Sequence, residues 1–290
     1  MRAASARESF EGSAPLGLIC GGGAFPRAVA EAARRAGRTV VLIAIRGAAD
    51  AELDSAGFPI EWVGLGSIAA LLGALRRHGC REIVVVGYVF RPRLTTLRLD
   101  WKAVTLLPWF LGALRGGDGH LLGHIAAFFE REGFHLKGAH EIAPDILVPV
   151  GLLGRIEADA DARADAGIGL RLLRALDCFD VGQAVVVARR HVQAIEAAEG
   201  TDAMLARCGA LRASGRVRLP RRVGVLVKAP KPGQDRRIDL PSIGPATIER
   251  AAAAGLAGIA VEAGGVIAAD LGALLRAADA AGLFVLGLAE

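Results

Sequence analysis

Between residues 15 and 90, short apolar runs alternate with segments of helical periodicity, and this alternation limits the possible fold more than any other feature. An apolar run of about five residues fits a buried strand, and the periodic segment after it fits a helix that returns the chain. Such a rhythm produces a parallel sheet covered by helices. The predicted strands are 16–20, 40–45, 60–65 and 82–89, and the predicted helices are 26–36 and 67–77.

The second half of the chain has a different pattern. Acidic residues cluster among alanines at 154–169, and a β-hairpin follows, with strands predicted at 183–188 and 191–196. Further strands are predicted at 223–227, 258–261 and 283–288, and helices at 201–208, 245–254 and 271–281. We therefore expect an α/β protein of two domains. Residues 15–155 form a Rossmann-like parallel sheet with its helices, residues 156–290 form a mixed α/β domain, and residues 1–14 form an extension without an assigned role.

Charge and cysteine content narrow the classes of function. The chain carries 35 basic and 30 acidic side chains, a net charge of +5, without a dense run of lysine and arginine. With three tryptophans and one tyrosine it offers no basic and aromatic pattern on which bases could stack, so we expect no nucleic-acid partner. The four cysteines fit no metal-binding spacing, and neither a signal peptide nor a membrane-spanning run is recognisable. We expect a cytoplasmic protein with reduced, buried thiols.

The most distinctive segment is residues 228–241, here called the charged segment. It follows an apolar run that fits a buried strand, and three prolines and a glycine limit its freedom. Its polar side chains are Lys228, Lys231, Gln234, Asp235, Arg236, Arg237 and Asp239. A basic surface turn is one interpretation. A phosphate and metal site is the other, because such a site needs cations, a carboxylate and little conformational freedom to lose.

Other candidate residues lie where predicted strands begin or end. Ligands of open α/β sheets bind at the carboxyl ends of the strands, so these positions are candidates for ligand contacts. Gly21, Gly22 and Gly23 let backbone N–H groups approach an anion, although a tight turn also explains them. The remaining candidates are Arg91, the pair His140 and Glu141, Gln183, and Glu262.

The glycine loop and the parallel sheet also fit a dinucleotide-binding oxidoreductase. The loop lacks the G-x-G-x-x-G pattern, and the second predicted strand ends in Arg46 where NAD enzymes carry a carboxylate for the ribose. Arg46 is compatible with NADP. An NADP-binding oxidoreductase therefore stays an alternative, but it leaves the charged segment without a role.

Several motifs, taken in order, resemble one known family. They are G-G-G-x-x-P after the first strand, G-A-H-E at 138–141, D-x-G-Q at 180–183, E-G-T-D-A-M-L at 199–205 and K-A-P-K-P-x-Q-x-x-R-x-D-L-P-x-I-G at 228–244. The sequence from Leu16 onward is similar to the LpxI-type UDP-2,3-diacylglucosamine diphosphatases of lipid A biosynthesis. The resemblance implies hydrolysis of the pyrophosphate, dependent on Mg²⁺ or another divalent cation, to UMP and 2,3-diacylglucosamine 1-phosphate (lipid X).

The resemblance also implies roles for the candidate residues. The essential acid of the family falls on Asp239, which would ligate the metal or orient the water that attacks the sugar-side phosphorus. Lys228, Lys231 and Arg237 would neutralise the pyrophosphate. The first domain would hold the nucleotide side, and residues 104–114 are a weaker candidate for acyl contact. The expected substrate contacts are Gly21, Gly22, Gly23, Arg91, His140, Glu141, Gln183, Lys231, Gln234 and Glu262.

The family implies a homodimer with an acyl cavity between its two domains. The amphiphilic substrate makes peripheral contact with the cytoplasmic face of the inner membrane an additional expectation. A non-catalytic carrier of nucleotide sugars or lipids is the remaining alternative, since binding residues alone do not prove turnover.

Overall fold

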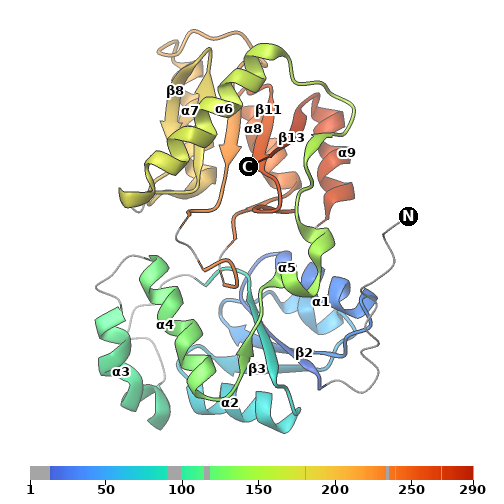
Figure 1. The fold of residues 1–290 in the computed structure, drawn as a ribbon, viewed down its shortest axis with the longest axis vertical. Coiled ribbons are helices and arrows are strands. Elements are labelled where there is room, and N and C mark those ends of the chain that lie inside the picture. The colour runs from blue at the N-terminus through green and yellow to red at the C-terminus, as the bar shows by residue number, and fades with distance from the viewer. Residues whose placement is uncertain are drawn as a thin grey trace. The chain divides into compact units, whose positions relative to one another are not determined.

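Two compact units make up the computed structural model of the chain (Figure 1), which describes residues 14–89, 99–113, 118–179, 181–232, 235–238, 240–268 and 270–289. The first unit ends at Pro144 and the second begins at Asp145. The sequence placed the boundary later, after residue 155. Strand β6 (Gly151–Leu153) pairs with β13 (Phe284–Leu288), so this segment belongs to the second unit. Of the predicted extension, residues 1–13 lie outside the described residues.

A five-stranded, entirely parallel sheet forms the centre of the first unit, in the order β3-β2-β1-β4-β5. Its strands are β1 (Leu16–Cys20), β2 (Val40–Arg46), β3 (Ile60–Gly64), β4 (Glu82–Val86) and β5 (His135–Leu136). Its helices are α1 (Phe25–Arg35), η1 (Ala51–Ser55), α2 (Ile68–Arg77), α3 (Trp101–Ala113), α4 (Asp118–Arg131) and α5 (Ala139–Ile142). The Rossmann-like parallel sheet that the sequence predicts is confirmed.

The burial of the central strand β1 explains why the strands of this half of the sequence are continuous apolar runs. All five residues of β1 are buried, as expected for a parallel strand with helices on both faces. Cys20 lies opposite Ala44 of β2 and Val86 of β4, so the carboxyl ends of these three strands lie at one edge. The loops that leave this edge are therefore brought together.

The second unit contains a six-stranded mixed sheet in the order β6-β13-β11-β9-β7-β8. Strands β9 (Val225–Lys228), β11 (Gly258–Glu262) and β13 are parallel, while β6, β7 (Ala184–Ala188) and β8 (His191–Ile195) complete the sheet with antiparallel pairs. A parallel pair, β10 (Ser242–Ile243) and β12 (Ile267–Ala268), lies outside it. The unit's helices are η3 (Pro144–Ile146), α6 (Ala160–Ala175), η4 (Asp177–Phe179), α7 (Gly200–Ala213), α8 (Pro245–Ala253) and α9 (Leu271–Ala281). The predicted mixed domain and its β7–β8 hairpin are confirmed.

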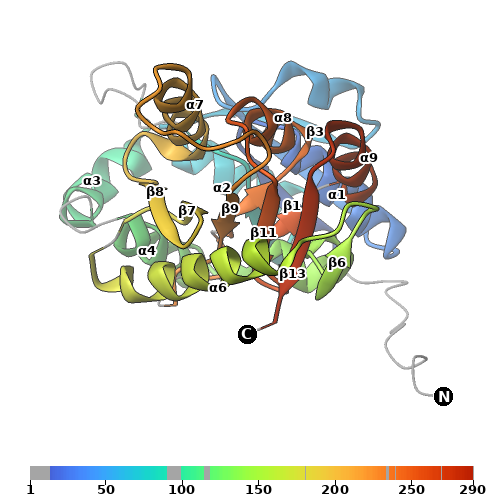
Figure 2. The ribbon, with the colours of Figure 1, turned by 90° about the horizontal axis from the view of Figure 1, so that it is seen from above.

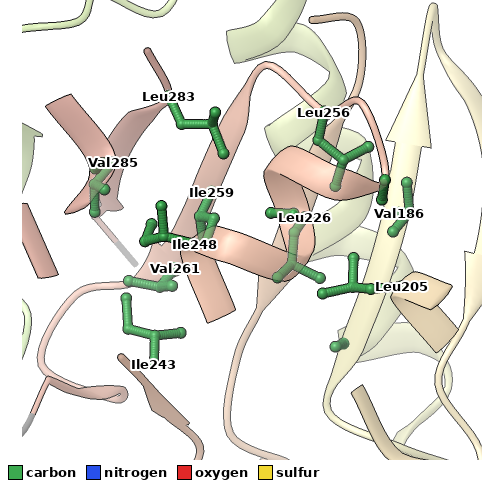
Figure 3. Packing of buried hydrophobic residues seen from close by; sticks show 14 of the residues in the cluster. Val186, Leu205, Leu226, Ile243, Ile248, Leu256, Ile259, Val261, Leu283 and Val285 are labelled. Carbon is green, nitrogen blue, oxygen red and sulfur yellow. The ribbon is translucent and has the colours of Figure 1, made fainter. Parts of the chain in front are cut away.

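Two hydrophobic cores cover the faces of this sheet. Helix α6 packs on one face, and α7, α8 and α9 pack on the other (Figure 2). Alternate residues of β9 divide between the two cores: Val225 and Val227 pack with α6, whereas Leu226 joins the opposite core with Ile248 of α8 (Figure 3). Because the alternation continues, Lys228 has the parity of Leu226, and Glu262 has the parity of the α6-facing Ala260.

The turn of the β7–β8 hairpin has an unusual conformation for its sequence. Arg189 and Arg190 both have positive φ angles, 50° and 64°, which non-glycine residues adopt at an energetic cost. Asp165 of α6 is buried, and its carboxylate accepts the N–H groups of Arg189 at 2.9 Å and of Arg190 at 2.6 Å. The turn is thus stabilised by a residue from another element.

Two predictions about the surface and the thiols can be compared with the structure. Within the described ranges, no helix has both the length and the apolar character needed to cross a membrane. Cys20, Cys80 and Cys208 are free and buried, but Cys178 is exposed, so the expectation of buried thiols is wrong there. Burial raises the pKa of the Cys20 thiol to about 12, which keeps it protonated and inert.

Candidate active site

Charged side chains of the second unit gather where β9 and β11 end, a place here called the charged edge. Lys228 is the last residue of β9, and only 8% of it is exposed. Its Nζ donates to the carbonyl oxygen of Ser242 in β10 at 3.0 Å. A lysine buried at the carboxyl end of a parallel strand is costly to desolvate, so its position indicates a use for the charge.

Glu262 is the last residue of β11, and it contacts two arginines. Its side chain is 6% exposed. Oε2 lies 3.4 Å from Nη2 of Arg174 in α6, and Oε1 lies 3.3 Å from Nη2 of Arg236 in the charged segment. Glu262, which was predicted to contact the substrate, therefore accepts hydrogen bonds from two arginines. Its negative charge would repel the phosphates of the substrate.

Asp235 and Arg237 form a local ion pair within the charged segment. The Nε and Nη2 atoms of Arg237 lie 3.0 and 2.8 Å from Oδ1 and Oδ2 of Asp235. The hydrogen bond from Arg237 lowers the pKa of the Asp235 carboxyl below its ordinary value. Arg237 was predicted to neutralise the pyrophosphate. In the structure its guanidinium pairs with Asp235, so a phosphate would share the guanidinium with that carboxylate.

The start of the hairpin is joined to the same edge. The N–H of Ala229 donates to the carbonyl oxygen of Gln183 at 3.1 Å, so Gln183 adjoins Lys228. The Gln183 N–H donates to Oε2 of Glu196, and the Thr201 hydroxyl donates to Oε1. Thr201 lies in the first turn of α7, and the Glu196 carboxylate is thus occupied by hydrogen bonds within the chain.

The charged segment begins against the end of β11. A Cβ added to Gly265 would lie 2.9 Å from both Pro230 Cγ and Glu262 Oε1, so only glycine fits between them. Lys231 follows Pro230 and is half-buried. The predicted residues Lys228, Lys231, Arg237, Gln183 and Glu262 therefore all belong to the charged edge, but Lys228 and Glu262 extend from opposite faces of the sheet, toward β10 and α6 respectively. The charged edge also contains Arg174, Asp235 and Arg236, to which the sequence assigned no role.

Three predicted residues lie outside the described residues: Arg91, Gln234 and Asp239. Within the described ranges, no group of three or more His, Cys, Asp or Glu side chains could hold a metal ion. The described carboxylates of the charged edge are held by arginines. A metal site at this edge would therefore have to rely on Asp239 and on oxygens of the substrate.

The glycine loop of the first unit is occupied by contacts within the chain. The N–H groups of Gly21 and Gly22 donate to the carbonyl oxygens of Val86 and Tyr88, each at 2.8 Å. The N–H of Gly23 donates to Oδ2 of Asp50 at 2.9 Å. An anion would have to displace these acceptors, so the predicted phosphate contact through the N–H groups of Gly21, Gly22 and Gly23 has no support from this geometry.

His140 and Glu141 lie in the short helix α5, also in the first unit. Oε1 of Glu141 accepts the N–H of Gly138 at 2.7 Å, and Oε2 lies 3.5 Å from Nζ of Lys137. Glu141 is thus part of a helix cap. Nδ1 of His140 is buried, and no described group makes a hydrogen bond to it. Substrate contact at His140 stays a prediction.

The weaker prediction for acyl contact concerns residues 104–114, and most of their side chains lie outside the description. Val104 is 54% exposed. The Trp109 ring packs against His124 and Phe128 of α4, with centroids 5.1 and 6.4 Å away. Trp109 therefore contributes to the α3–α4 packing, while acyl contact by this helix stays a prediction.

Comparison with known proteins agrees with the fold and with the motifs. The model of the LpxI N-terminal domain matches residues 15–146, and that of the LpxI C-terminal domain matches residues 149–286. The chain is thus a two-domain α/β protein of the LpxI type, and it belongs to the LpxI family. It is 44% identical to the UDP-2,3-diacylglucosamine pyrophosphatase LpxI of Caulobacter vibrioides over 273 residues, which is 94% of this chain and 97% of the relative.

Proposed function

We propose that this protein hydrolyses the pyrophosphate bond of UDP-2,3-diacylglucosamine to UMP and 2,3-diacylglucosamine 1-phosphate. The identity to a relative with that activity extends over both domains and supports the assignment. The observation that carries it is the composition of the charged edge, which contains Lys228, Lys231 and three arginines but only two described carboxylates. Such an excess of positive charge suits a substrate with two adjacent phosphates.

The reaction joins the oxygen of water to the sugar-side phosphorus and breaks the bond from that phosphorus to the bridging oxygen, which leaves with UMP. The negative charges of the pyrophosphate repel an incoming oxygen, and charge also develops on the bridging oxygen. Lys228 is held in place by Ser242, so its ammonium group needs little reorganisation to stabilise that charge.

We include Mg²⁺ as a proposed cofactor, with Asp239 either as its ligand or as the residue that orients the water. Mg²⁺ commonly binds one or two carboxylates together with substrate phosphates and water, so an edge with few available carboxylates is compatible with it. When bound, the ion would polarise the phosphate oxygens. The homodimer, the acyl cavity and peripheral contact with the inner membrane are proposed from the same resemblance.

Phosphorus NMR of UDP-2,3-diacylglucosamine incubated with the purified protein tests the proposal. We expect UMP and a sugar 1-phosphate to form with Mg²⁺ but not with EDTA. In water labelled with ¹⁸O, the label should enter the sugar 1-phosphate. The variant Asp239→Asn should lose at least about 10³-fold in kcat, as catalytic groups commonly do.

Each negative outcome has its own meaning. If the folded protein binds the substrate tightly with Mg²⁺ but leaves the pyrophosphate intact, it is a carrier. If NADP raises the melting temperature of the protein and UDP-2,3-diacylglucosamine does not, the result favours an NADP-binding oxidoreductase. Near-normal turnover by Asp239→Asn would remove that residue from the mechanism and leave the reaction standing.

A further inference from the structure

Arg174 belongs to no sequence motif, yet it shares a carboxylate partner with the charged segment. It lies in the last turn of α6, and Glu262, its partner, is 88 positions further along the chain. Arg236 reaches the same carboxylate from the charged segment. Because each guanidinium contacts a different oxygen of one carboxylate, two cations from separate elements lie side by side at the end of β11.

Burial within this trio is uneven. The Glu262 side chain is 6% exposed, whereas those of Arg174 and Arg236 are each 43% exposed. The anion is thus enclosed by the protein, and each cation presents part of its surface to solvent.

The charges of the trio do not balance. One carboxylate neutralises one guanidinium, so these three side chains together carry a net positive charge. The contacts of 3.3 and 3.4 Å are longer than the roughly 2.8 Å of a strong arginine–carboxylate bond. Each contact joins one nitrogen of an arginine to one carboxylate oxygen, whereas a guanidinium carries five N–H donors.

The frame around the trio is firmly packed. Leu170 and Leu173 of α6 are buried in the core beneath Arg174. Glu262 ends a strand whose five residues are all buried, and Gly265 and Pro230 pack closely beside its carboxylate. Two guanidinium groups held on such a frame lose little freedom on binding an oxyanion.

We propose that Arg174 and Arg236 form a clamp for a phosphate group of the substrate, and that Glu262 is the positioning residue that keeps the two guanidinium groups together. Arginine suits this role because its planar fork donates two parallel hydrogen bonds to phosphate oxygens. The inference extends the proposed function by adding a binding residue outside the charged segment. It requires only that the protein binds a phosphorylated ligand.

Isothermal titration with inorganic pyrophosphate tests the clamp without turnover. The matched variants are Arg174→Ala and Arg171→Ala, since Arg171 is an exposed arginine one turn earlier on the same helix. We expect Arg174→Ala to weaken pyrophosphate binding about tenfold or more, and Arg171→Ala to change it less than about twofold. Equal affinities of the two variants, or no pyrophosphate binding by the wild-type protein, would overturn the clamp.

Two further titrations identify which phosphate is held. If the Arg174→Ala defect appears with glucosamine 1-phosphate and not with UMP, the clamp serves the sugar side; the reverse result assigns it to the nucleotide side. Pyrophosphate binding by a wild-type protein that does not hydrolyse UDP-2,3-diacylglucosamine would refute the proposed function and leave the clamp intact.

The variant Glu262→Gln separates positioning from simple stabilisation. It keeps the side-chain volume and both arginines but removes the charge that aligns them. We expect kcat to fall about tenfold while KM stays unchanged or decreases, because more positive charge is then available to bind the substrate. A lower melting temperature with an unchanged kcat would make Glu262 a structural residue and refute its positioning role.

Discussion

The glycine loop of the first unit and the charged edge of the second occupy equivalent places, because each lies at the carboxyl ends of parallel strands. At the glycine loop, Gly21 and Gly22 exchange backbone hydrogen bonds with the chain around Tyr88, and Asp50 accepts the N–H of Gly23. At the charged edge, the last residues of β9 and β11 are a buried lysine and a buried glutamate. The strand ends are thus covered by backbone contacts in the first unit, whereas they carry charged side chains in the second.

The difference teaches that glycines after a strand have two explanations that a sequence alone does not separate. A Cβ on Gly21 would lie 2.5 Å from the carbonyl oxygen of Tyr88, and one on Gly87 would lie 2.7 Å from that of Gly22. Both glycines are thus required by the contact between two loops. Long charged side chains at strand ends have no such packing reason, and they are the stronger sign of a site.

The largest effect is expected when a positive charge is removed from the charged edge of the second unit. Lys228→Met keeps an unbranched chain of similar length but loses the ammonium group at the charged edge. We expect kcat/KM for UDP-2,3-diacylglucosamine to fall about 10²-fold or more, as when one preorganised electrostatic contact is lost. Steady-state kinetics measures this, and Lys102→Met, which removes a lysine of α3, is the control. Activity within about threefold of wild type would show that the buried lysine is only structural.

The second test introduces a side chain into the glycine loop. Gly21→Ala would bring a methyl group against the carbonyl of Tyr88, so we expect the free energy of unfolding to fall by about 2 kcal/mol or more. Urea denaturation measures the change. Gly123→Ala is the control, because an added Cβ in the middle of α4 meets no atom within 4 Å, and it should be neutral or stabilise by up to about 1 kcal/mol. If Gly21→Ala is as stable as this control, the loops do not need their close approach.

The smallest expected effect concerns the ion pair of Asp235 and Arg237. The pKa of Asp235 is lowered from its ordinary value of 3.8, so the charged form stabilises the folded state. This contribution is complete above that value and is lost as the pH falls through the lowered pKa. Asp235→Asn should therefore reduce the free energy of unfolding near neutral pH, by less than about 1 kcal/mol because solvent screens the pair.

Urea denaturation of wild-type protein and Asp235→Asn, from neutral pH into the acid range, measures this effect. The difference between the two proteins should shrink as the pH falls below the ordinary value of the carboxyl. A difference that stays constant over the whole range would mean that the pair contributes nothing through its charge.

Much of the fold was predictable because the strands are buried and continuous. The predicted strand 16–20 coincides with β1, and the predicted hairpin strands 183–188 and 191–196 contain β7 and β8. The predicted strand 82–89 is too long, since β4 ends at Val86. Gly87 has a φ of 87°, and Tyr88 turns to pair with Gly22, a contact between distant segments that no local pattern shows.

The site was predictable only where it depended on strand ends or on the charged segment. Lys228 and Glu262 were found because each follows an apolar run. The pairing of Asp235 with Arg237 is local, and the two-residue spacing was a signal that could have been used. Arg174 carried no signal, because an arginine near a helix C-terminus is common and its partner lies far along the chain.

The hairpin turn at Arg189 and Arg190 also depends on a residue that is distant in the sequence. Its sequence lacks the glycine or asparagine that usually defines a two-residue turn, and the acceptor of its N–H groups comes from α6. A peptide of residues 184–195 alone would lack that acceptor and would have to bend differently. The conformation of this turn therefore depends on α6, and we expect the helix and the hairpin to form together.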